Sequence, residues 1–205
     1  MLRLYRAPWS TNVERVALAL AHKGLAVESV VIRYEDRSAV EAVSGQGLVP
    51  VIEDDGRVVA DSHAIIRYLD EHWPEPPLFP SEPARRAELD VFLEWFDRVW
   101  KGPPNELEAE LANAEPDQSR IAELSALMDQ RLDLFEQMLR GRDHLLGQDF
   151  SAADCVAFPF LKYARRSENG DTEAFHRVLD EHQSLAGRPR LAAWIERVDE
   201  RPRAY

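Results

Sequence analysis

The first seventy-two positions of the chain switch between strand-like and helix-like spacing of hydrophobic residues. Short alternating or β-branched runs predict strands, and apolar residues that recur every three or four positions predict helices, in this order: a strand at 2–5, helices at 11–22 and 36–44 separated by a strand at 27–32, and a helix at 62–72. Between the last two helices, two β-branched pairs flank Asp55-Gly56, which favours a tight turn between antiparallel strands. The predicted order is β-α-β-α-β-β-α.

A change in composition follows this segment. Residues 74–80 contain four prolines, too many for a helix or a sheet to continue, and only helical patterns come after them. Regular apolar spacing predicts a helix from Arg85 to Trp100, a second around residues 121–139 and a last one that opens near Arg188. We therefore expect an α/β + all-α chain: a thioredoxin-like domain over residues 1–74, a linker over 75–84 and an all-helical domain over 85–205.

Three helix starts carry capping signals. Thr11 and Glu14 have the spacing of a capping box, with Thr11 as the N-cap and Ser10 just before the helix. Ser151 and Asp154 form a second box of the same kind. The third signal is the pair Asp61-Ser62, which opens the helix at 62–72. The free backbone N–H groups at this helix start and the Ser62 hydroxyl predict a binding site for a carboxylate.

The Val49-Pro50 step precedes the predicted hairpin. Proline at the first position of a strand removes no ladder hydrogen bond, and the residue before it is held extended. We expect the Val49 N–H and C=O to face outwards, where an extended peptide can pair with them as an added strand. An edge for peptide backbone beside a helix start for a carboxylate suits a small peptide such as glutathione.

These residues resemble a known family. Val49-Pro50, the hairpin and the acidic-Ser pair Asp61-Ser62 resemble the glutathione-binding half of the cytosolic glutathione S-transferases, and Ser10 lies five residues before Arg15 as in the phi, tau and zeta types. The resemblance implies that Ser10 is the catalytic residue, that Val49 and Pro50 bind the cysteinyl part of glutathione, and that Asp61 and Ser62 hold its γ-glutamyl end. It also implies a homodimer and a small hydrophobic electrophile as second substrate.

A transferase reaction of this kind requires a hydrogen-bond donor that stabilises the glutathione thiolate. A thiol of pKa near ~8.5 is only about 3% ionised at pH 7, and a serine hydroxyl with a helix N-terminus can supply the ~2.7 kcal/mol that lowers this pKa by ~2 units. The first-helix turn has no cysteine, which excludes redox chemistry there and the transferases that form mixed disulfides. Tyr5 is the rival donor, while Arg15 is expected to support the helix start.

Several positions depart from the family pattern. Leu48 stands where many serine-type members have Gln or Lys, so one contact to the tripeptide is lost. The short loop after residue 32 leaves only Arg33, Arg37 and Gln46 as candidates for the glycine carboxylate. In the helical domain, four aromatic residues are candidates for lining an electrophile pocket or for core packing: Trp95, Trp100, Phe158 and Tyr163.

Composition narrows the function classes. The formal charge of −12 repels a nucleic-acid backbone, and no run approaches the ~18 apolar residues of a membrane span. The single Cys155 cannot form an internal disulfide and fits a structural role in a reducing, cytoplasmic compartment. The six histidines lack the spacing of metal ligands, so we expect no metal site.

Two classes of function remain open at this stage. The first is a glutathione transferase, with a zeta-like isomerase or a glutathione peroxidase as variants that use the same thiolate. The second is a binding or interaction module that keeps the fold without catalysis, which Leu48 and the loop poor in basic residues favour. Ser10, Pro50 and Ser62 together favour the enzyme.

Overall fold

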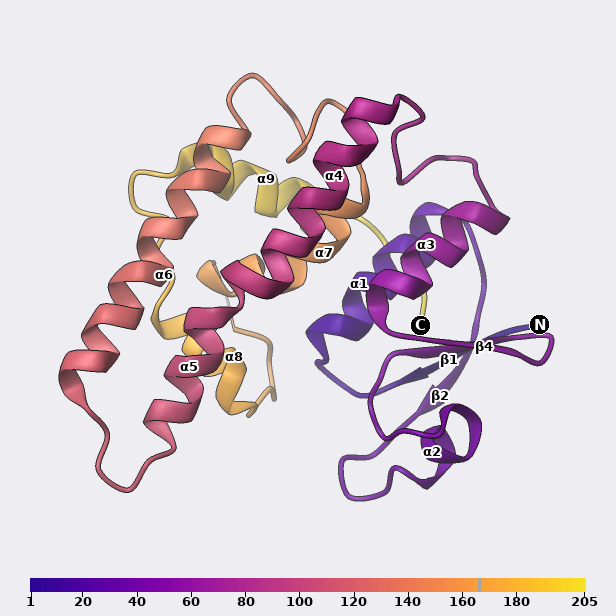
Figure 1. Cartoon of the computed structure of the whole chain (residues 1–205), viewed down its shortest axis with the longest axis horizontal. Helices are drawn as coiled ribbons and strands as arrows, with labels where there is room; N and C mark the ends of the chain where they lie inside the picture. The colour runs from indigo at the N-terminus through magenta and orange to yellow at the C-terminus, as the bar shows by residue number, and fades with distance from the viewer. Residues whose placement is uncertain (166) are drawn as a thin grey trace. The chain divides into compact units, whose positions relative to one another are not determined.

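The computed structural model describes residues 1–165 and 167–205, which form two compact units. The first comprises Met1–Pro80 together with Arg201–Tyr205, and the second comprises Ser81–Glu200. The last five residues of the chain therefore belong with the first unit, although no pattern in the sequence predicts this. Figure 1 labels the helices and strands of both units.

The first unit has the predicted order of elements. These are β1 (Leu2–Arg6), α1 (Thr11–His22), β2 (Glu28–Val31), α2 (Ser38–Ser44), β3 (Val51–Asp54), β4 (Arg57–Ala60) and α3 (Ser62–His72). The four strands form one mixed sheet in the order β2-β1-β3-β4, in which β2 is parallel to β1 and both other pairs are antiparallel. This is the thioredoxin-like fold, so the prediction is confirmed.

Alternation along the strands gives the sheet two buried faces. Figure 1 shows α1 and α3 together on one side of the sheet, where Leu4 and Ile52 are fully buried, and α2 on the other side. Tyr5 and Val51 point to the second face and pack with Val40 of α2. Covering both faces fixes the register of β1 against β3, because a slip of one residue would exchange the two sets of side chains.

The hairpin between β3 and β4 turns where the sequence predicts. Asp55 and Gly56 have φ values of 46° and 87°, the positive values that a two-residue hairpin turn needs. Glycine adopts such a φ without strain, and aspartate is among the few other residues that tolerate it. The turn therefore sets the pairing of Asp54 with Arg57 and of Val51 with Ala60.

The elements of secondary structure described in the second unit are all helices, as predicted. Its elements are α4 (Pro83–Trp95), η1 (Phe96–Trp100), α5 (Gly102–Leu111), α6 (Gln118–Met138), α7 (Ala152–Leu161), η2 (Lys162–Ala164), α8 (Ala174–Glu181) and α9 (Pro189–Asp199). The predicted helix from Arg85 to Trp100 ends in a π-helical turn, η1. Pro103 and Pro104 end that helix and also open α5, since proline is tolerated in a first turn. Sequence reasoning did not anticipate α8.

Aromatic side chains form the core of the second unit. The rings of Phe96 and Trp100 stack with centroids 4.5 Å apart, and Phe135 and Phe160 meet them edge to face. Trp100 and Phe158, two of the four candidates for an electrophile pocket, are buried, as is Tyr163. These three residues therefore pack inside this unit, which was the alternative role considered for them.

Asp154 links three parts of the second unit. Ser151 caps α7 and forms the predicted capping box with Asp154, whose carboxylate accepts the Ser151 N–H at 2.9 Å. The same carboxylate accepts the Leu145 N–H at 3.1 Å and the Trp194 Nε1–H of α9 at 2.8 Å. Asp154 has no exposed surface. A residue predicted as a local cap therefore also fixes a loop and a distant helix.

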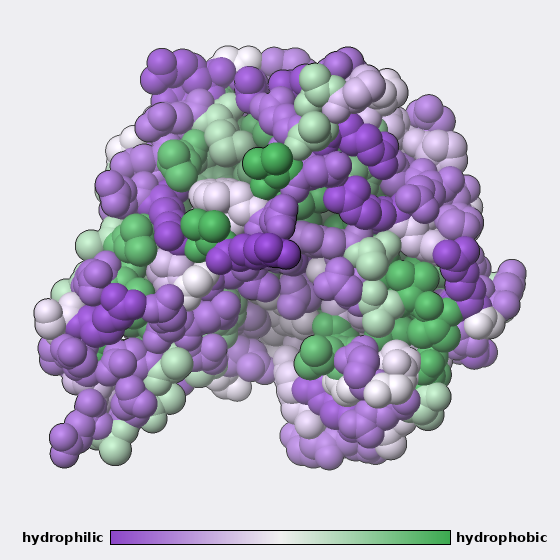
Figure 2. All heavy atoms as spheres, viewed as in Figure 1, coloured by the Kyte–Doolittle hydropathy of each residue, from purple (hydrophilic) through white to green (hydrophobic). Residues whose placement is uncertain are grey.

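Some large apolar side chains reach the surface. Figure 2 shows hydrophobic side chains gathered over the part of the first unit where Figure 1 draws the strands. The exposed apolar residues of this unit include Trp9, Val31, Leu48 and Val58. Among the helices described, none is both long enough and apolar enough to cross a bilayer.

We predict that Asp154→Ala lowers the free energy of unfolding by about 3 kcal/mol, because it leaves several buried donors without an acceptor. Urea denaturation followed by circular dichroism measures the loss. Asp143→Ala is the matched control, since Asp143 is exposed and its ion pair with Arg197 spans 3.8 Å; its effect should stay within about 0.5 kcal/mol. Equal losses in both variants would contradict the central role of Asp154.

Candidate functional site

The sheet register brings the three predicted site segments to one edge. Tyr5, near the end of β1, pairs with Val51 at the start of β3, and Val51 pairs with Ala60 at the end of β4. The chain therefore leaves β1 toward Ser10, enters β3 from Val49 and leaves β4 toward Asp61 at the same edge. The segments are far apart in sequence, and their meeting follows from the antiparallel pairing of β3 with both neighbours.

Ser10 is the N-cap of α1. Its hydroxyl oxygen accepts the Val13 N–H at 3.3 Å. The prediction that Thr11 caps this helix in a box with Glu14 is wrong: Thr11 is the first helical residue, and Glu14 pairs with Arg203 instead. Among the described residues, none accepts the Ser10 hydroxyl proton. The helix thus holds the oxygen in place and leaves its proton available.

The backbone before β3 is also available for pairing. The Val49-Pro50 bond is cis. Within the described chain, neither the N–H nor the C=O of Val49 has a hydrogen-bond partner, and the residue is half-buried. Leu48 beside it is 76% exposed. The Gln46 amide donates to the Leu48 carbonyl at 3.0 Å, so this candidate for the glycine carboxylate is engaged by the chain itself.

Asp61 caps α3. One carboxylate oxygen, Oδ1, accepts the N–H groups of His63 and Ala64, each at 3.0 Å. Two amides that we expected to be free for a ligand are therefore occupied, and that part of the prediction is wrong. The other oxygen, Oδ2, accepts no hydrogen bond from the described residues and is on an exposed residue. Asp61 has a φ of 77°, a value that aspartate seldom adopts.

A buried arginine connects the starts of α1 and α3. The Arg15 side chain is 1% exposed, and its Nη1 donates to the Ser62 hydroxyl at 3.3 Å and lies 3.4 Å from His63 Nε2. Ser62 is itself 3% exposed. Arg15 thus holds Ser62 at the start of α3, a contact that sequence reasoning missed because the two residues are 47 positions apart.

The remaining candidates have identifiable partners. The Tyr5 hydroxyl donates to Glu53 Oε2 at 3.0 Å, and burial, followed by this hydrogen bond, raises the pKa of Tyr5 above its usual value. Tyr5 therefore holds its proton toward Glu53. Arg33 pairs with Glu35 at 3.7 Å, whereas the Arg37 guanidinium lies over the ring of Tyr34. The Tyr34 hydroxyl donates to the Pro8 carbonyl at 3.2 Å, so this loop packs beside the turn that leads to Ser10.

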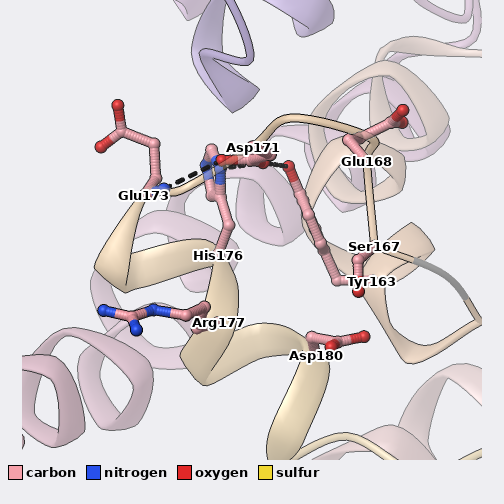
Figure 3. A pocket seen from close by; sticks show the side chains of 8 residues that line it. All are labelled: Tyr163, Ser167, Glu168, Asp171, Glu173, His176, Arg177 and Asp180. Carbon is pink, nitrogen blue, oxygen red and sulfur yellow. Dashed lines mark hydrogen bonds and ion pairs between the residues drawn. The ribbon is translucent and has the colours of Figure 1, made fainter.

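The second unit holds a small polar cavity. Figure 3 shows Tyr163 and His176 on either side of Asp171. The Tyr163 hydroxyl and His176 Nδ1 each lie 2.7 Å from Asp171 Oδ2, and their rings stack with centroids 4.8 Å apart. The cavity volume is about 30 Å³, which matches one water molecule and is too small for an organic electrophile. Across the residues described, no group of three or more His, Cys, Asp or Glu is arranged to hold a metal ion.

Two protein-family models match the chain, one in each unit. The family model described as "Glutathione S-transferase, N-terminal domain" matches residues 4–77, and the one described as "Glutathione S-transferase, C-terminal domain" matches residues 118–197. The chain belongs to the cytosolic glutathione S-transferase family. The resemblance found in the sequence is thereby confirmed. In this transferase-family protein, the sheet edge that carries Ser10, Val49 and Asp61 belongs to the first unit.

Two curated relatives differ in what their names describe. Glutathione S-transferase GstB of Escherichia coli is 25% identical over 211 residues, which cover 98% of this chain and 95% of the relative. FtsZ-localized protein A of Caulobacter vibrioides is 29% identical over 170 residues, 77% of this chain and 75% of the relative. Among solved structures, a glutathione S-transferase from Rhodospirillum rubrum has a TM-score of 0.73 at 29% identity, covering 98% and 89% of the two chains.

We predict that Asp61→Ala lowers the free energy of unfolding by about 1–2 kcal/mol, because it removes the cap of α3 and places alanine at a positive φ. Asp61→Asn keeps a capping oxygen and should change stability by less than about 0.5 kcal/mol. Urea denaturation of the three proteins gives the comparison. A similar loss in both variants would show that the negative charge, rather than the cap, stabilises this helix start.

Proposed function

We propose that this protein is a glutathione transferase in which Ser10 stabilises the thiolate of bound glutathione. The observation that carries the proposal is the state of the Ser10 hydroxyl, whose oxygen accepts the Val13 N–H while its proton has no acceptor among the described residues. A hydroxyl fixed in this way can donate to a thiolate at the start of α1, where the helix dipole also favours negative charge.

The neighbouring segments suit the rest of the tripeptide. The unpaired N–H and C=O of Val49 can pair with the cysteinyl backbone, with Pro50 fixing the entry into β3. Asp61 Oδ2 can accept from the γ-glutamyl ammonium, and the Ser62 N–H at the first position of α3 can donate to its carboxylate. The geometry of this edge and the membership of the chain in the family support these assignments.

The reaction then follows from the bound thiolate. Its sulfur forms a bond to an electrophilic carbon of a small hydrophobic substrate, and a leaving group departs with the electron pair, or a double bond takes up that pair and a proton. A zeta-like isomerase or a glutathione peroxidase would begin with the same thiolate. We expect the protein to work as a homodimer in the cytoplasm, as other family members do.

A second candidate is a binding module without catalysis. Two observations favour it: Leu48 is exposed where a polar contact to the tripeptide is expected, and one relative, FtsZ-localized protein A, has a name that gives a location and no reaction. The two candidates differ in the ionisation of bound glutathione, since only the transferase requires its thiol pKa to be lowered.

We predict that glutathione bound to the protein has a thiol pKa near ~6.5, about two units below that of an ordinary thiol, and that Ser10→Ala returns it toward ~8.5. The thiolate is the form present above the pKa, so the midpoint of turnover against pH should move upward by the same amount. Well below pH 6.5, turnover of Ser10→Ala should be roughly a hundredfold lower than that of the parent, while glutathione affinity changes little. Ultraviolet difference absorbance of the thiolate measures the pKa.

Ser119→Ala is the matched control, because Ser119 is an exposed serine in the second unit. It should leave the thiol pKa and turnover unchanged. Saturable glutathione binding with an ordinary thiol pKa in the parent protein would reject the transferase and favour the binding module. A lowered pKa that survives Ser10→Ala would reject Ser10 as the donor.

We further predict that Leu48→Gln tightens glutathione binding about five- to tenfold, the range expected for one added hydrogen bond of about 1 kcal/mol. Because Leu48 is exposed, the change should not affect folding. Isothermal titration with reduced glutathione measures the affinity, and Val58→Gln is the control because it alters an exposed apolar residue of β4. Equal affinities in the parent and in Leu48→Gln would place the tripeptide away from Leu48.

A further inference from the structure

The C-terminal segment, Arg201–Tyr205, packs along α1 in the first unit. Arg201 Nη2 lies 3.0 Å from His22 Nδ1 at the end of the helix, and the Ala204 N–H donates to the Ala17 carbonyl at 3.1 Å. The segment continues toward the start of α1, where the ring of Tyr205 lies 4.9 Å from the Arg6 guanidinium at the end of β1. It therefore extends along the helix that begins at Ser10.

Arg203 of this segment pairs with a carboxylate in the first turn of α1. Its Nε and Nη2 lie 3.1 Å and 2.9 Å from Glu14 Oε1. Glu14 is 7% exposed, and its N–H donates to the Ser10 carbonyl in the first hydrogen bond of the helix. A nearly buried negative charge is thus placed one helical turn after Ser10, and the guanidinium that compensates it comes from 189 residues away.

This pairing matters for a thiolate at the same helix start. Two negative charges at the same helix start repel each other, so loss of the Arg203 guanidinium from Glu14 would oppose ionisation of a thiol at Ser10. Among the described residues, the other charged or titratable side chains that their contacts place around the helix start are Arg6 of β1, Arg15 of α1, His63 of α3 and Tyr205 of the C-terminal segment. Arg15 is already directed toward Ser62.

We propose that Arg203 is a positioning residue for the thiol site, which compensates the charge of Glu14 and so keeps the start of α1 favourable for a thiolate at Ser10. The inference deepens the proposed function and rests on it for its biological meaning. The effect of the Glu14–Arg203 pair on a thiol at position 10 can be tested without glutathione.

The experiment places a thiol at the helix start itself. In Ser10→Cys the introduced side chain occupies the N-cap position, and the native Cys155 is buried and reacts slowly. The pKa of the introduced thiol is read from thiolate absorbance and from the rate of iodoacetamide alkylation against pH. Adding Arg203→Gln should raise this pKa by about one unit, so that the thiolate fraction below the pKa falls about tenfold.

Three further variants separate charge from packing. Arg203→Lys keeps the charge and should leave the pKa close to that of Ser10→Cys alone. Adding Glu14→Gln to Arg203→Gln removes the repelling carboxylate and should restore the low pKa, although the ion pair between positions 14 and 203 is still missing. Arg98→Gln, which removes an exposed arginine of the second unit, should have no effect. Circular dichroism confirms that each variant is folded.

The outcomes distinguish this inference from the proposed function. An unchanged thiol pKa in Arg203→Gln, or a raised pKa that Glu14→Gln fails to restore, overturns the role of Arg203. A glutathione titration of the parent protein forms the second arm: no binding there rejects the proposed function, while the thiol of Ser10→Cys still decides whether Arg203 compensates Glu14. If both arms hold, Arg203→Gln should also raise the pKa of bound glutathione.

Discussion

The buried guanidinium of Arg15 is the constraint around which the first unit is arranged. A permanent charge at 1% exposure needs hydrogen-bond acceptors close by, since burying it without them is expensive. The guanidinium of Arg15 in α1 donates a hydrogen bond to Ser62 in α3. This bond fixes the two helix starts relative to each other. Because each helix follows a strand that ends at the same edge of the sheet, this one side chain holds the parts of the candidate site together.

Most of the fold was predictable because its signals are local. Asp55-Gly56 set the hairpin, the apolar spacing of residues 11–22 set α1, and Ser151 with Asp154 set the start of α7. The cap of α1 was misplaced by one residue because Ser10, Thr11 and Asn12 are all good N-cap residues, and only tertiary contacts choose among them. Glu14, the other half of the expected box, is drawn away by Arg203.

The candidate site was predictable in its residues but not in its hydrogen bonds. Ser10, Asp61 and Ser62 follow the ends of strands and Val49 precedes the start of one, and the topology alone brings these positions to one edge. Asp61 accepts hydrogen bonds from two amides of its own helix, and Ser62 accepts one from Arg15. Both contacts depend on side-chain geometry, which residue spacing does not encode. The pairing of Arg203 with Glu14 has no local signal at all.

The contribution of residues 201–205 to the first unit has a consequence for synthesis of the chain. A ribosome releases the strands and helices of residues 1–80 long before the segment that packs on α1 exists, so this unit remains incomplete while the whole second unit is being made. Its last contacts join residues up to 189 positions apart, the kind of closure that forms late. The nascent first unit would therefore lack the ion pair between Arg203 and Glu14 until translation reaches Arg203.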